Sequence, residues 1–135
     1  MDAAPVAPLK QPESGPVLVV EDDDDLCEIV SILLTGDGLG VIRARTGREA
    51  LLLLEQGLRP GVILLDLMMP EMSGEELGQR MREEGFSDIP IVVWSGGKQV
   101  DEAACQMGAV AFLRKPSEWS AILDVVRRYA GAPPA

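Results

Sequence analysis

The sequence of 135 residues contains no histidine, two cysteines and few aromatic residues. The lack of histidine excludes a His-based catalytic triad, most kinds of zinc site and acid–base catalysis by an imidazole. Cys27 and Cys105 do not form a CxxC motif, which fits a reduced compartment and no disulfide framework. There is also no apolar run of ~18 residues and no secretory signal, so we expect a cytoplasmic protein without a membrane span.

Positive charge is scarce as well, because 12 Lys and Arg residues stand against 22 Asp and Glu residues, a net charge of −10. Nucleic acids are bound mainly through basic side chains, so this composition predicts no nucleic-acid partner. An acidic chain can instead hold a divalent cation. The hydrophobic fraction of 47% is typical of a soluble globular domain, and a chain of this length can fold without disulfides or a structural metal.

The two ends of the chain differ in composition from the middle. Residues 1–16 contain four of the ten prolines and show no hydrophobic periodicity, so we expect a disordered leader. Residues 131–135 are expected to form a disordered tail. The folded unit is then a single domain over residues 17–130, and no output domain is expected after residue 130.

Within this unit, short apolar runs typical of strands alternate with patterns typical of helices. The expected strands are 17–20, 40–43, 62–65, 89–94 and 109–113, and the expected helices are 26–34, 46–56, 73–84, 98–107 and 117–129. Capping boxes open the second and third helices at Thr46 and Ser73, and Asp23 or Asp24 is expected to cap the first. This alternation predicts an α/β fold with a parallel sheet covered by helices on both faces.

Polar or small residues directly follow the predicted strands. They are Glu21, Asp22, Asp66, Ser95, Gly96 and Lys115. In a sheet of this kind the ligand lies beyond the carboxyl ends of the strands, so we expect these residues to converge. Carboxylates that are brought together repel one another, and a hard divalent cation relieves the repulsion. Mg²⁺ prefers oxygen ligands in octahedral geometry, so the pattern predicts a magnesium site.

A carboxylate beside a metal ion, an ammonium group and a hydroxyl can accept a phosphoryl group. Asp66 is the expected nucleophile and would become an acyl phosphate, while Lys115 and the metal neutralise the phosphoryl oxygens. Ser95 offers a hydroxyl, and Gly96 leaves room for the ligand. Trp94 is expected to pack in the core and, as the neighbour of Ser95, to act as a fluorescent reporter of the site.

Four segments together resemble a response regulator receiver domain. They are 17–23 (VLVVEDD), 62–74 (VILLDLMMPEMSG), 92–96 (VVWSG) and 111–116 (AFLRKP). Each segment alone is a weak signal, but all four in this order are highly specific, and the resemblance covers residues 17–130. It implies a flavodoxin-like, doubly wound sheet of five parallel strands in the order 2-1-3-4-5, flanked by five helices.

The resemblance also implies a role for each site residue. Asp66 is the phosphoacceptor, Glu21 and Asp22 form the acidic metal-binding pair, and the backbone carbonyl of Met68 completes the metal ligands. Ser95 is the switch hydroxyl that turns toward the phosphoryl group, beside Gly96. Lys115 binds the phosphoryl group, and its bond to Pro116 is expected to be cis. Phe112 lies at the position of an aromatic switch, often tyrosine, and without a hydroxyl it can flip but cannot hydrogen-bond to a partner.

The implied partners are a histidine kinase or histidine phosphotransfer protein and a downstream protein target. Whether the chain forms a weak homodimer through its last two helices is left open by the sequence. The resemblance implies no enzymatic activity beyond self-catalysed phosphorylation and dephosphorylation.

Three other functions fit the sequence less well. An aspartyl-nucleophile phosphatase needs a second aspartate two residues after its nucleophile, where this chain has Met68. A nucleotide- or flavin-binding module needs a Gly- or hydroxyl-rich loop after the first strand, where this chain has five acidic residues. The intact Asp66, Lys115 and Ser95 argue against a degenerate receiver that serves as a scaffold without phosphorylation.

Overall fold

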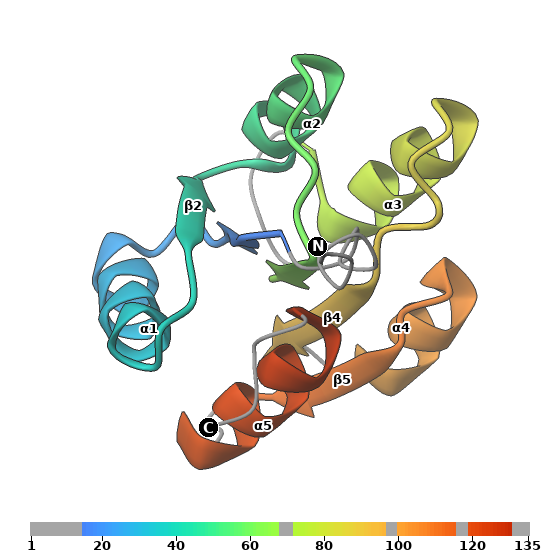
Figure 1. Cartoon of the computed structure of the whole chain (residues 1–135). Helices are drawn as coiled ribbons and strands as arrows, with labels where there is room; N and C mark the ends of the chain where they lie inside the picture. Colours follow the sequence, from blue (N-terminus) through green and yellow to red (C-terminus); the bar gives the residue numbers. More distant parts are fainter. Residues whose placement is uncertain (1–14, 68–71, 97–99, 116–118, 131–135) are drawn as a thin grey trace, which may run out of the picture.

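The computed structural model describes residues 15–67, 72–96, 100–115 and 119–130, in which strands and helices alternate (Figure 1). The elements are β1 (Val17–Val20), α1 (Asp24–Gly36), β2 (Val41–Ala44), α2 (Gly47–Glu55), β3 (Val62–Leu65), α3 (Gly74–Glu83), β4 (Ile91–Ser95), α4 (Val100–Met107), β5 (Ala111–Arg114) and α5 (Trp119–Ala130).

The five strands form one parallel sheet in the order β2-β1-β3-β4-β5, which confirms the predicted fold. The register aligns Val20 with Leu65 and Ser95 with Arg114. The residues that follow β1 and β3 are therefore neighbours, and so are those that follow β4 and β5. All of them lie at the carboxyl edge of the sheet, where the predicted site residues were expected to converge.

Helices cover both faces of the sheet, as Figure 1 shows. Alternate strand residues such as Leu18, Ile63 and Val93 pack against α2, α3 and α4. The residues between them, such as Val19 and Leu64, pack against α1 and α5. Central strands that are buried on both faces carry continuous apolar runs, and this explains why β1 and β3 show no polar alternation.

Short polar side chains begin the first three helices. Asp23 caps α1, and its side chain accepts hydrogen bonds from the backbone N–H groups of Asp25 and Leu26. The hydroxyls of Thr46 and Ser73 accept from the third residue of their helices in the same way. The structure thus confirms the predicted caps and selects Asp23 over Asp24.

The last two strands begin two residues later than predicted. The N–H of Ile89 donates to the carbonyl of Phe86, so the chain still turns there, and β4 extends to Ser95. The N–H of Ala109 donates to the carbonyl of Ala104, which closes the end of α4 around Gly108 at φ +75. Because Ile89 and Ala109 still form hydrogen bonds within the preceding turn or helix, each strand begins two residues later than predicted.

Some predictions fall outside the described residues. These include the cap at Ser117, the isomer of the Lys115–Pro116 bond, the tail 131–135 and most of the leader. Within the predicted leader, the carbonyl of Pro16 accepts a hydrogen bond from the N–H of Gly61.

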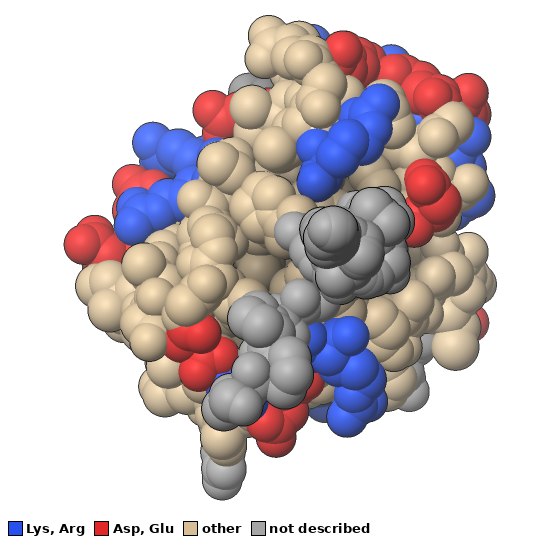
Figure 2. All heavy atoms as spheres, in the orientation of Figure 1, with Lys and Arg blue, Asp and Glu red and all other residues tan. Residues whose placement is uncertain are grey.

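Two surface features bear on the predicted partners. None of the described helices is long and apolar enough to cross a membrane. On the face shown in Figure 2, the coloured Lys and Arg side chains lie apart from one another and alternate with Asp and Glu, without a broad basic patch. Cys27 is buried under α1 and Cys105 is exposed on α4, so these unpaired cysteines lie on opposite sides of the sheet.

Candidate functional site

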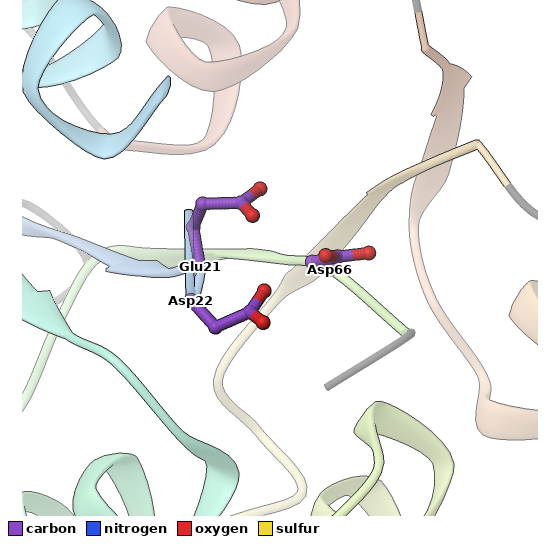
Figure 3. Close-up of side chains that lie close together, drawn as sticks. All are labelled: Glu21, Asp22 and Asp66. Carbon is purple, nitrogen blue, oxygen red and sulfur yellow. The ribbon is translucent and has the colours of Figure 1, made fainter. Parts of the chain in front are cut away.

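Three carboxylates meet at the carboxyl edge of the sheet. Glu21 and Asp22 follow β1 and Asp66 follows β3, and one oxygen of each lies within 4.8 Å of the others. In Figure 3 the side chains of Glu21 and Asp22 extend toward the side on which Asp66 lies. Glu21 and Asp66 are only 2% and 6% exposed, while Asp22 is more open to solvent. A hydrogen bond of 3.0 Å from the N–H of Asp66 to the carbonyl of Val20 holds the two strand ends together.

A lysine that follows the edge strand β5 reaches this cluster. The Nζ of Lys115, directly after β5, lies 2.6 Å from Oε1 of Glu21 and 3.5 Å from Oδ2 of Asp66. The backbone N–H of Lys115 donates to the carbonyl of Ser95 at 3.1 Å, which continues the pairing of β4 and β5. Lys115 thus contacts both buried carboxylates and bonds most closely to Glu21.

Ser95 ends β4 and is fully buried. Its Oγ has no hydrogen-bond partner among the described residues. Leaving a buried hydroxyl unsatisfied costs about 1–3 kcal/mol, so a ligand that supplies an acceptor here would gain free energy. At the neighbouring Gly96, an added Cβ would lie 3.5 Å from Cβ of Lys115, an ordinary contact, so the described neighbours leave room for a side chain there.

Gly74 is a residue of the site that the sequence reasoning did not identify. A Cβ at this position would lie 2.8 Å from Cα of Leu67 and 3.0 Å from the carbonyl oxygen of Asp66. The N–H of Gly74 donates to the carbonyl of Leu67, so α3 starts directly against the end of β3. Only glycine allows this close approach. In the sequence, a glycine directly after the capping Ser73 is the feature that could have pointed to it.

The remaining predicted residues lie apart from the carboxylates or outside the described part. Phe112 is in β5, is 42% exposed, and lies on the opposite side of the strand from Leu113. Met68 lies outside the described residues. Trp94 is 3% exposed, as expected for a core residue, but its ring also contacts the site, because Nζ of Lys115 lies 4.7 Å from its centroid.

Burial controls the ionisation of Glu21. Removal from water raises the pKa of Glu21 above its ordinary value of 4.5. The hydrogen bond from Lys115 and the N–H of Asp23 act to lower this pKa, while the charge of Asp66 acts to raise it. The burial effect dominates, so this carboxyl group ionises less readily than an exposed one.

This raised pKa predicts a pH-dependent stability of the metal-free protein. The folded protein binds the Glu21 proton more tightly than the unfolded chain does. The stability that protonation contributes is therefore present at low pH and is lost as the pH rises through the raised value. We expect the unfolding free energy of the wild type, relative to Glu21→Gln, to fall as the pH rises above 4.5, the ordinary pKa of this carboxyl group. Urea denaturation in a chelator measures this difference, and a difference independent of pH would contradict the prediction.

The donor atoms of the cluster fit magnesium. Three carboxylates face one ammonium group, so a divalent cation would balance the negative charge that Lys115 leaves uncompensated. Magnesium binds carboxylate oxygens and usually keeps several waters, and the more open Asp22 leaves access for them. Among the described residues the cluster has only carboxylate ligands, which suit a hard cation.

Comparison with known proteins gives the same family from three directions. The sequence profile of the response regulator receiver domain matches residues 17–127. The chain is 37% identical to the transcriptional regulatory protein FixJ of Azorhizobium caulinodans, over 89% of this chain and 57% of that protein. It is 35% identical to an uncharacterized 14.6 kDa protein of Leptolyngbya boryana, over 87% of this chain and 92% of that protein. The crystal structure of a response regulator receiver protein from Pseudomonas putida shares its fold with a TM-score of 0.78 and 31% identity, over 84% of this chain and 96% of that one.

The chain spans about half the length of several curated relatives that it matches, 57% in the case of the A. caulinodans protein. Because the receiver profile covers most of the chain and solved receiver structures share its fold, the chain belongs to the response regulator receiver domain family of two-component signal transduction.

Proposed function

We propose that this chain is a Mg²⁺-dependent phosphoacceptor that receives a phosphoryl group on Asp66 from a histidine kinase or a histidine phosphotransfer protein. One observation carries the proposal: oxygens of Glu21, Asp22 and Asp66 lie within 4.8 Å of one another, at a point that Lys115 also reaches. An acidic cluster of this kind, with its own ammonium group, is suited to binding a divalent cation together with a phosphoryl group.

The residues that would hold the metal are Glu21, Asp22 and Asp66, together with the backbone carbonyl of Met68, which lies outside the described residues. Asp22 is the more open of the three carboxylates and would bind the metal directly, while Glu21 would bind it directly or through water. When bound, the metal would supply positive charge to the oxygens of the transferred group.

The chain's own residues carry out the transfer. A carboxylate oxygen of Asp66 attacks the phosphorus in line with the bond to the donor imidazole. The new O–P bond forms as the P–N bond breaks, and the imidazole of the donor keeps the electron pair. Lys115 stabilises the negative charge on the phosphoryl oxygens, and Ser95 donates its unpartnered hydroxyl to one of them. The product is an acyl phosphate on Asp66.

The acyl phosphate would change the protein in one of two ways. It would shift a two-state equilibrium around Ser95, Phe112 and α4, and so change a protein-binding surface, or it would be relayed to a further partner. The ring of Phe112 is half-exposed, and because it lacks the hydroxyl of a tyrosine it cannot form a hydrogen bond with a partner. A downstream protein target, a cytoplasmic location, no nucleic-acid partner and at most a weak homodimer belong to the same proposal.

Tryptophan fluorescence tests the pocket directly. Trp94 contacts Lys115, so we expect its emission to change on adding Mg²⁺ and again on adding beryllofluoride, an analogue of a phosphoryl group. The Trp119→Phe variant isolates the signal of Trp94 from that of the other tryptophan. In Asp66→Ala the response to beryllofluoride should disappear. A beryllofluoride response that survives this substitution would place the phosphoryl site elsewhere.

A further inference from the structure

The ammonium group of Lys115 has a third neighbour besides its two carboxylates. Its Nζ lies 4.7 Å from the ring centroid of Trp94, close enough for a cation–π interaction. Trp94 is 3% exposed, so little water competes for this face of the ring. No step of the phosphoryl transfer described above uses this tryptophan.

The register of the sheet brings the two side chains together. Trp94 is aligned with Leu113, and both side chains face the layer of α1 and α5. Lys115 follows Leu113 by two residues, and the alternation of a strand directs it to the same face. The hydrogen bond from the N–H of Lys115 to the carbonyl of Ser95 maintains this alignment beyond the end of β5. The contact is therefore set by the backbone.

Packing alone does not account for a tryptophan at this position. The Nε1–H of Trp94 is buried and has no hydrogen-bond partner among the described residues. A phenylalanine or leucine would avoid this cost. The ring is instead held in place by Trp119, whose ring lies 6.3 Å away at an interplanar angle of 64°. Trp119 comes from the first residue of α5, so helix and strand together orient the ring under the ammonium group.

A ring in this place restricts a flexible side chain. The four-carbon stem of lysine has many rotamers, and tryptophan attracts an ammonium group more strongly than other aromatic residues do. We propose that Trp94 is a positioning residue, which holds the ammonium group of Lys115 beside Asp66. The inference rests on the proposed function for its effect on phosphoryl transfer. The position of Lys115 can be measured without it.

The position of Lys115 is measured by NMR on the whole chain labelled with [¹³C]lysine. The sequence has three lysines, and Lys115→Arg identifies the signal of Lys115. Protons above an aromatic ring shift upfield, so we expect the Hε protons of Lys115 to lie upfield of those of Lys10 and Lys98. Trp94→Leu should remove this shift. Trp94→Phe should keep part of it, because a smaller ring remains.

The consequence for function is measured as the rate of phosphoryl uptake from phosphoramidate at saturating Mg²⁺. We expect Trp94→Leu to lower this rate roughly tenfold, because a loosely held group loses its orientation toward the reacting atoms. Trp94→Phe should restore part of the rate. Val92→Ala is the matched control, since Val92 is also buried on the same face of β4 but lies two residues before Trp94, farther from the carboxyl edge of the sheet. It should keep both the upfield shift and the rate.

Each other outcome overturns the inference. A Lys115 signal without an upfield shift in the wild type, or one that keeps its shift in Trp94→Leu, would show that the ring does not hold the lysine. An unchanged uptake rate in Trp94→Leu, or an equal loss in Val92→Ala, would refute the positioning role. If Trp94→Leu does not fold, the inference is tested by the upfield shift of Lys115 in the wild type and by the shift and the uptake rate of Trp94→Phe. An upfield shift in a wild type that takes up no phosphate would instead refute the proposed function, and with it the positioning of Lys115 for transfer.

Discussion

Replacing Asp66 by alanine is expected to abolish the uptake of acid-labile phosphate from a phosphorylated histidine kinase. An acyl phosphate needs a carboxylate, and Asp66 is the buried carboxylate directly after β3, beside Glu21 and within 3.5 Å of Nζ of Lys115. The measurement is transfer of labelled phosphate to this chain, followed by treatment with acid. The isosteric Asp66→Asn should behave in the same way, because an amide is not a nucleophile of comparable strength.

A matched control removes another acidic side chain close by. Asp25 lies in the first turn of α1, is exposed and takes no part in the carboxylate cluster, so Asp25→Ala should leave the uptake close to the wild-type level. Phosphate that Asp66→Ala takes up in acid-labile form would contradict the assignment. Residual label that is stable in acid would instead indicate an ester, for which the buried and unpartnered hydroxyl of Ser95 is a candidate among the described residues.

Replacing Lys115 by glutamine is expected to change two quantities in opposite directions. The rate of phosphoryl uptake at saturating Mg²⁺ should fall about 10²-fold to 10³-fold, because a donor that stabilises developing charge is lost. The affinity for Mg²⁺ should rise, because Glu21 loses the ammonium group that lies 2.6 Å away and competes with the cation for its carboxylate. Uptake is followed as above, and magnesium affinity is measured by titration calorimetry, because Lys115→Gln removes the contact through which Trp94 would report.

The conservative variant separates charge from geometry. Lys115→Arg keeps the positive charge, but its planar guanidinium cannot occupy the same point between two carboxylates and a ring. We expect an uptake rate between those of the wild type and Lys115→Gln, and a magnesium affinity near that of the wild type. If Lys115→Gln lowered uptake and magnesium affinity together, the lysine would be holding the pocket together, and the charge argument would be wrong.

The fold could be predicted from local patterns, but the ends of its elements could not. The apolar runs at 17–20 and 62–65 match β1 and β3 residue for residue, since both are central strands bounded by clear signals. The predicted strand at 109–113 begins too early, because Ala109 closes α4 through a bond to Ala104. Apolar residues occur both at the end of a helix and at the start of a strand. The hydrophobic pattern of 109–113 therefore could not show where α4 ends and β5 begins.

The site shows the same division. The positions of Glu21, Asp66, Ser95 and Lys115 directly after strands predicted that they would share one edge, because parallel strands end on the same side. Nothing in that argument predicted that Lys115 would lie closer to Glu21 than to Asp66, or that Trp94 would contact it. These distances depend on register and on the packing of α5.

The sequence by itself determined the alternation of strands and helices and the chemistry at the carboxyl edge, since periodicity and residue type are properties of short segments. The tertiary structure alone decided how the charges are paired, how far Glu21 is buried and which ring lies beneath Lys115. Burial and pairing arise between segments far apart in the chain, from Glu21 to Lys115 and from Trp94 to Trp119, and they exist only once the sheet and its helices have assembled.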